Sequence, residues 1–241
     1  MVEPARQRMT ANAPILKFDA VAIESNPLYE SAICDINFEL ACGELMLVLL
    51  DSEHLLLPLA DAAQGLALPL QGRITYLGED WQAMPSDRAA WRRGSIGRIF
   101  PEAGWISNLD MDENITLAQR HHTRRAAGAI TDEAAVLARQ FGLPGLPLGK
   151  TDLLRRQDLQ KAACVRAFLG EPTLILAEDP TRHVYADVMA PLVNALFAAR
   201  KRGAAVLWAT SNPKVWNDAG IRPTARCKMS GSQMHHVEKA A

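Results

Sequence analysis

Two adjacent carboxylates, Glu178 and Asp179, are the residues of this chain best suited to chemistry. They follow the apolar run TLILA at 173–177, whose composition is typical of a strand buried on both faces. Paired carboxylates after a strand can hold magnesium and polarise a water molecule. The interpretation of the pair therefore depends on what the neighbouring segments could bind.

A second apolar run, ELMLVLL at 44–50, precedes the segment DSEHLLLP at 51–58. A phosphate-binding loop needs glycines whose N–H groups surround the phosphate and a lysine that neutralises it. The segment contains neither glycine nor lysine. We therefore predict a loop packed with apolar side chains, in which the lone histidine His54 has a surface or packing role.

The elements that must position these residues form an α/β pattern. Residues 15–23 and 33–40 alternate apolar and polar side chains, as half-buried antiparallel strands do. The apolar runs at 44–50, 173–177 and 204–210 predict three central strands. Helical patterns and a final hairpin complete the prediction, the helices at 86–93, 132–141, 158–169 and 186–202 and the hairpin at 225–237.

The order and spacing of several segments resemble the ATP-binding subunit of ABC transporters. The similar segments are the turn at Gly43 and Glu44, then GRITYLGEDW, IGRIF, WISNLDMDENITL and DLQKAACVRAFLGEPTLILAEDPT. The resemblance implies a P-loop NTPase-like (RecA-like) core with an antiparallel β subdomain and a helical subdomain. It implies one ABC domain over 13–237, with core parts 13–106 and 167–237, an inserted helical subdomain at 107–166, and flexible termini at 1–12 and 238–241.

At the phosphate-binding loop, the resemblance aligns leucines with the glycine, lysine and hydroxyl positions. Acidic residues at this loop would also repel a triphosphate, and Pro58 has no N–H to donate. The altered positions are Leu50, Glu53, Leu55, Leu56 and Leu57, with Asp51 the second acidic residue.

Pro101 stands where the family has a glutamine that contacts magnesium, and proline cannot replace it. Trp105 and Ile106 follow, and they either pack into the subdomain or contact a transporter's coupling helix.

The remaining nucleotide-contacting positions also depart from the family pattern. The signature sequence, which meets the phosphate bound to the opposite subunit, is replaced by Leu154, Arg155, Arg156, Gln157 and Asp158, which we interpret as a solvated basic turn. Tyr185 replaces the D-loop aspartate, Ser211 replaces the H-loop histidine, and Tyr29 is a displaced candidate for the aromatic residue that stacks on adenine.

The carboxylate pair is the best preserved of these positions, but its order is exchanged. Glu178 stands where the resemblance implies the aspartate that holds magnesium, and Asp179 where it implies the glutamate that polarises water. A misplacement on the order of 1 Å can cost ~100-fold in rate. We therefore expect no cofactor, and ATP with magnesium only if the chain retains unorthodox catalysis through this pair.

Composition limits the classes of partner. The 241 residues carry a net charge of −1, so no general attraction to nucleic acid is expected. The four cysteines lack the spacing of metal ligands. We expect neither a membrane-spanning segment nor a signal peptide. We expect a cytoplasmic protein, peripheral on the inner membrane through a permease.

Three functions remain open from the sequence. The first is a non-catalytic subunit that docks on a membrane permease or on an active ATPase as a dimer. The second is an ABC ATPase that still binds and hydrolyses ATP to drive transport. The third is a soluble regulatory or scaffold protein derived from such an ATPase.

Overall fold

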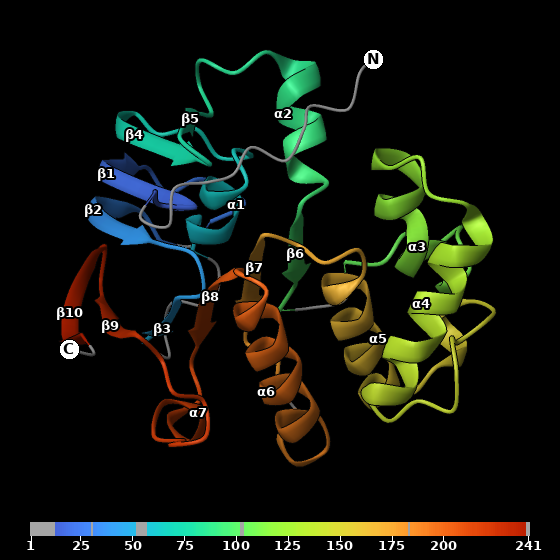
Figure 1. Ribbon diagram of the computed structural model, residues 1–241. Helices are drawn as coiled ribbons and strands as arrows, with labels where there is room; N and C mark the ends of the chain where they lie inside the picture. Colours follow the sequence, from blue (N-terminus) through green and yellow to red (C-terminus); the bar gives the residue numbers. More distant parts are fainter. Residues whose placement is uncertain (1–12, 30, 52–56, 102–103, 183, 240–241) are drawn as a thin grey trace.

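The computed structural model describes residues 13–29, 31–51, 57–101, 104–182 and 184–239 (Figure 1). Two sheets carry the fold. The first is antiparallel, in the order β2-β1-β4-β5, with β1 at Leu16–Ile23, β2 at Ile33–Leu40, β4 at Gln71–Tyr76 and β5 at Glu79–Asp80. The antiparallel pairing predicted for the first two strands is confirmed.

The second sheet has the order β10-β9-β3-β8-β7-β6, and all its neighbours are parallel except the hairpin of β9 and β10. The three predicted central strands lie side by side in it. Its members are β3 at Leu45–Leu49, β6 at Ile96–Ile99, β7 at Leu174–Glu178, β8 at Ala205–Thr210, β9 at Ala225–Ser230 and β10 at Gln233–Lys239.

Both faces of this second sheet are covered. In β3, Leu45 and Leu47 belong to one apolar cluster while Met46 and Val48 belong to another, as the two-residue period of a strand requires. The first cluster packs against the helices, and the second lies against the antiparallel sheet. Continuous apolar runs in the sequence therefore mark strands between two layers.

Eight helical segments of the described chain surround the sheets. They are α1 at Leu59–Ala63, α2 at Ser86–Arg93, α3 at Met111–His122, α4 at Ala127–Gln140, a 3₁₀ turn at Thr151–Leu153, α5 at Arg156–Phe168, α6 at Tyr185–Lys201 and α7 at Pro213–Trp216. The helices predicted from the sequence all form. The ends of α2 match the prediction, and those of α4, α5 and α6 differ from it by one to five residues. The inserted helical subdomain at 107–166 stays a prediction.

Helix α3 was not predicted, because its buried face is largely polar. Asn114, Thr116 and Gln119 are buried beside Met111 and Ile115, so the apolar period is interrupted. Its N-terminus is nevertheless marked by a capping contact, in which the Asp110 N–H donates to the Glu113 carboxylate at 2.9 Å.

Gly97 allows α5 to approach β6 closely. A Cβ at this position would lie 1.9 Å from the carbonyl oxygen of Ala167, so a side chain cannot be accommodated without moving the backbone. At the other end of the sheet, β10 continues through Glu238 and Lys239, two residues that we expected in the flexible terminus.

Candidate functional site

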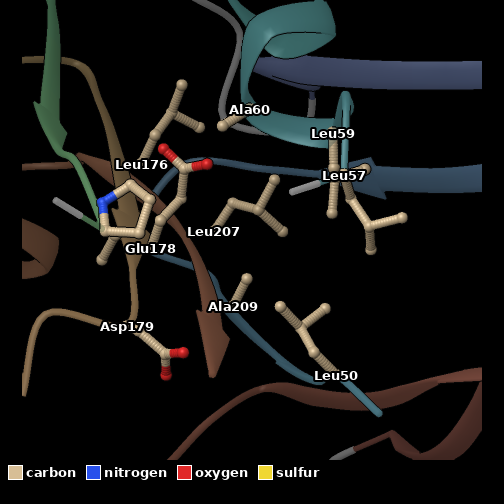
Figure 2. Close-up of a pocket in the computed structure, with 11 residues that line it drawn as sticks. Leu50, Leu57, Leu59, Ala60, Leu176, Glu178, Asp179, Leu207 and Ala209 are labelled. Carbon is tan, nitrogen blue, oxygen red and sulfur yellow. The ribbon is translucent and has the colours of Figure 1, made fainter. Parts of the chain in front are cut away.

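Glu178 and Asp179 lie at the carboxyl end of β7, where their side chains point in different directions. Figure 2 shows Glu178 directed toward α1 and Asp179 directed away from it. Asp179 has a positive φ of 41°, a left-handed conformation that aspartate tolerates better than most residues. The two carboxylates therefore belong to different sets of contacts.

The Asp179 carboxylate is held by the end of β8. It accepts hydrogen bonds from the Thr210 hydroxyl at 2.8 Å, from the Ser211 N–H at 2.8 Å, and from the Ser211 hydroxyl at 2.7 Å. Asp179 is 6% exposed, so these three donors replace water. The sequence selected both Asp179 and Ser211 as site positions, and the structure brings them into direct contact.

The Glu178 carboxylate is ion-paired with Arg98 of β6, the strand beside β7. The Arg98 Nε lies 2.7 Å from Glu178 Oε2, and the arginine side chain is only 9% exposed. The same guanidinium pairs with Asp61 of α1 and donates to Gln64 Oε1 at 3.0 Å. A single buried cation thus joins three elements.

Tyr29 extends this network toward the antiparallel sheet. Its hydroxyl donates to Asp61 Oδ2 at 2.8 Å. Burial and the hydrogen bond to Asp61 raise the pKa of Tyr29 to about 12, so it stays a neutral donor at physiological pH. The sequence proposed Tyr29 for stacking on adenine, whereas the structure gives its hydroxyl a fixed acidic partner.

Opposing effects set the charge state of the ion pair. Burial lowers the pKa of Arg98, but the charges and hydrogen bonds of Glu178 and Asp61 outweigh this effect and raise it. Burial raises the pKa of Glu178, and the guanidinium of Arg98 offsets part of that rise. Arginine therefore remains the cation of the cluster.

A small cavity lies between Leu50 and Leu57 on one side and the carboxylate pair on the other. Its volume is about 30 Å³, enough for a water molecule or two, whereas ligand sites usually occupy several hundred cubic ångströms. Its described lining is mainly apolar and comprises Leu50, Leu57, Leu59, Ala60, Pro101, Leu176, Ala177, Glu178, Asp179, Leu207 and Ala209.

A stack of arginines and aromatic rings leads from Arg98 toward Trp105. The Arg98 guanidinium carbon lies 4.4 Å from the Phe100 ring centroid, and that of Arg166 lies 5.2 Å from the same centroid. Arg166 also covers Trp105 at 4.2 Å. Burial and repulsion from Arg98 lower the pKa of Arg166 to about 10, which leaves it charged near neutral pH.

The residues beside this stack differ in exposure. Trp105 is half-buried against the helical core, while Ile106 is 44% exposed. The side chain of Asn114 in α3 holds Ile106, accepting from its N–H at 2.8 Å and donating to its carbonyl at 3.0 Å. Trp105 therefore packs inward, whereas Ile106 faces outward, and contact of Ile106 with a coupling helix stays a prediction.

Comparisons with known proteins identify the family of this chain. The chain is 30% identical over 190 residues to an uncharacterized ABC transporter ATP-binding protein of Mycobacterium tuberculosis, which covers 76% of this chain and 75% of the relative. The chain belongs to the ABC transporter ATP-binding protein family. It is also 29% identical over 153 residues to a putative hemin import ATP-binding protein of Staphylococcus haemolyticus, covering 64% of this chain and 69% of that protein.

Solved structures agree on the fold. The dimeric structure of MJ0796, a bacterial ABC transporter cassette, superposes with a TM-score of 0.80 at 18% identity, covering 94% of this chain and 99% of the cassette. The chain therefore has the mixed α/β, P-loop NTPase-like fold of an ABC ATPase. No family model matches the chain.

Of the ABC phosphate-loop positions, the structure describes Leu50, Asp51, Leu57 and Pro58. Leu57 is 8% exposed and packs in the apolar layer, as predicted, while Leu50 is half-buried beside the same layer. The predictions for Glu53, His54, Leu55 and Leu56 lie outside the described residues.

The ABC signature positions surround the start of α5. Arg155 and Arg156 are exposed, as predicted, but Arg156 begins α5, so the segment is a helix start and not a separate turn. Leu154, Gln157 and Asp158 are half-buried. Tyr185 at the D-loop position donates its hydroxyl to Asp218 at 3.0 Å. The hydroxyl of Tyr185 thus contacts Asp218, which is not a member of the Arg98 network.

Sequence reasoning missed Arg98, Asp61 and Gln64. Their signal was present, because Arg98 interrupts the apolar strand IGRIF and Asp61 interrupts the apolar segment LADAA. A lone charge within a buried element indicates a buried partner of opposite charge. Within the described ranges, no group of three or more histidine, cysteine or acidic side chains is arranged to hold a metal ion.

Proposed function

We propose that this chain is a non-catalytic ABC-type subunit, which keeps the family fold and assembles with a partner that supplies catalysis or transport. The observation that carries this proposal is the engagement of both site carboxylates by protein groups, Glu178 by Arg98 and Asp179 by Thr210 and Ser211. A carboxylate held in this way is poorly available to bind magnesium or to polarise water.

The signature position supports the same proposal. An ABC signature presents glycine N–H groups to a phosphate, whereas the bulky Arg155 and Arg156 prevent that close backbone approach. A dimer of this subunit with an active ATPase would therefore alter both composite sites, one at its phosphate loop and one at its signature. We expect such a subunit to regulate or scaffold its partner.

The proposed partner is a membrane permease or a second ABC ATPase. Relatives are named as phosphonates import and lipoprotein-releasing ATP-binding proteins, which favours a transport role. The described helices include none long and apolar enough to cross a bilayer. We propose that the chain reaches the membrane through the permease, with the exposed Ile106 at the contact.

ATP hydrolysis by the purified protein tests the proposal. We expect no magnesium-dependent phosphate release above that of a double variant, Glu178→Gln with Asp179→Asn, measured in parallel with an active ABC ATPase as positive control. Hydrolysis that the double variant abolishes would instead establish the unorthodox ATPase. Detergent extracts should contain a stable complex with a permease or ATPase; a protein that purifies alone from membranes would favour a soluble scaffold.

A further inference from the structure

Three side-chain oxygens converge on the guanidinium of Arg98. Asp61 Oδ1 and Gln64 Oε1 share its Nη1, while Glu178 Oε2 lies 2.7 Å from its Nε. Two carboxylates and an amide oxygen are the type of ligand that hard divalent cations such as Mg²⁺ take in proteins. Here an arginine from the neighbouring strand occupies their common centre.

The charges of the cluster are partly balanced without any bound ion. The side chains of Arg98, Asp61 and Glu178 are 9%, 24% and 18% exposed, so each charge needs a partner. Arg98 supplies one positive charge against two carboxylates. The guanidinium of Arg166 lies near enough to be repelled by the charge of Arg98. Tyr29 donates a hydrogen bond to the second oxygen of Asp61.

We propose that the Arg98 guanidinium is the resident cation of this site, held among Asp61, Gln64 and Glu178 where a divalent metal ion would otherwise bind. The inference rests on the proposed function, because it requires that neither magnesium nor nucleotide occupies the site of the arginine. A cation carried by β6 is part of the fold, so α1, β6 and β7 stay joined in the absence of metal.

The role of Arg98 predicts a defined change when its charge is removed. In Arg98→Met, Asp61 and Glu178 face each other without a counter-ion, at a position already poor in water. A buried carboxylate that loses its partner is strongly destabilising, and we expect the melting temperature in EDTA to fall by about 10 °C. A divalent ion can then enter, so Mn²⁺ or Mg²⁺ should restore about 3 °C or more.

The experiment is thermal unfolding of the full chain, without nucleotide, in EDTA and in excess MgCl₂ or MnCl₂. The matched control is Arg73→Met, which removes an arginine that is 67% exposed and pairs with Asp80 at the surface. We expect the wild type and Arg73→Met to melt at nearly the same temperature with and without the ions. A double variant, Arg98→Met with Glu178→Gln, should recover stability in EDTA and lose the response to the ions.

Two results would overturn the inference. One is an Arg98→Met protein that melts like Arg73→Met and ignores divalent ions; the other is a wild-type protein that the ions stabilise as strongly as the variant. If Arg98→Met yields no folded protein, the double variant decides, since its folding supports the inference and its failure to fold contradicts it. Failure of the proposed function appears separately, as magnesium-dependent ATP binding or hydrolysis by the wild type.

Discussion

The Asp179 side chain has a structural role at the end of the sheet. Its oxygens accept hydrogen bonds from Thr210 and Ser211, the residues where β8 ends. The family resemblance assigns this position to water activation, but here its carboxylate connects the ends of two neighbouring strands by hydrogen bonds. Replacing the carboxylate leaves three donors without an acceptor in a buried place, which costs more than the hydrogen bonds alone.

We therefore predict that Asp179→Ala lowers the free energy of unfolding by about 3 kcal/mol, because buried donors to a charged acceptor are left unsatisfied. Urea unfolding followed by circular dichroism measures this change. Asp19→Ala, which removes an exposed carboxylate from β1, serves as the control and should change the free energy of unfolding by less than about 0.5 kcal/mol. Equal effects of the two substitutions would contradict the assigned role.

The sequence revealed some site residues and not others, depending on how far each lies along the chain from its contact partners. Glu178 ends β7, Asp179 follows it and Ser211 follows β8, so the apolar runs together with the family resemblance identified them. Arg98 was missed because its partners Asp61 and Glu178 are 37 and 80 residues away. A long side chain at a strand position has several rotamers, and only the packed fold determines which carboxylates it reaches.

Among the elements, strands were easier to predict than helix ends. Apolar runs locate β3, β7 and β8 because each strand is covered on both faces. Helix α3 escaped prediction because polar side chains such as Asn114 are buried in it and satisfied by the loop at Ile106. Periodicity detects apolar burial and gives no signal for polar burial of this kind.

The contact between α5 and β6 gives a prediction about glycine. Gly97→Ala places a methyl group 1.9 Å from the Ala167 carbonyl oxygen, so the helix must move away from the sheet. We expect a loss of about 3 kcal/mol in the free energy of unfolding, the upper range for overpacking. Gly128→Ala in α4 is the control, since no neighbour lies within 4 Å and alanine favours a helix. A Gly97→Ala protein as stable as Gly128→Ala would contradict the close approach.

Helix α3 also carries a pH-sensitive residue, His122. Burial and the neighbouring His121 lower the pKa of His122, so the folded protein prefers the neutral ring. Its stabilising contribution is present above the ordinary histidine pKa and is lost as the pH falls toward the lower value of the folded state. We predict a smaller free energy of unfolding at pH 5.5 than at pH 7.5.

Chemical denaturation at both pH values tests this prediction. The His122→Gln variant should lose part of the pH dependence, while His235→Gln, which changes an exposed histidine of β10, should retain it. If His122→Gln keeps the full pH dependence of the wild type, the burial of His122 does not contribute as argued.

At the scale of the whole molecule, the ABC framework persists where sequence identity is low. A TM-score of 0.80 accompanies 18% identity to the MJ0796 cassette. Many sequences can place apolar side chains in the two cores of this fold. Phosphate chemistry requires particular side chains at particular places, so the architecture alone does not assign an activity.

The surface around Ile106 gives a prediction about assembly. We expect Ile106→Asp to leave the melting temperature unchanged and to reduce copurification of the permease or ATPase partner by about tenfold, the loss typical of a well-buried interface residue. Val136→Asp on α4 is the control, because Val136 is 46% exposed and Ile106 is 44% exposed. An unchanged yield of complex with Ile106→Asp would remove this loop from the docking surface.

We propose that this ABC subunit does not use nucleotide, and the decisive experiment is an equilibrium titration of the purified wild-type chain with ATP. The titration is performed by calorimetry with and without magnesium. We expect no saturable binding up to about 1 mM ATP, a dissociation constant that corresponds to a binding free energy of roughly −4 kcal/mol. A magnesium-dependent dissociation constant tighter than that value would contradict it.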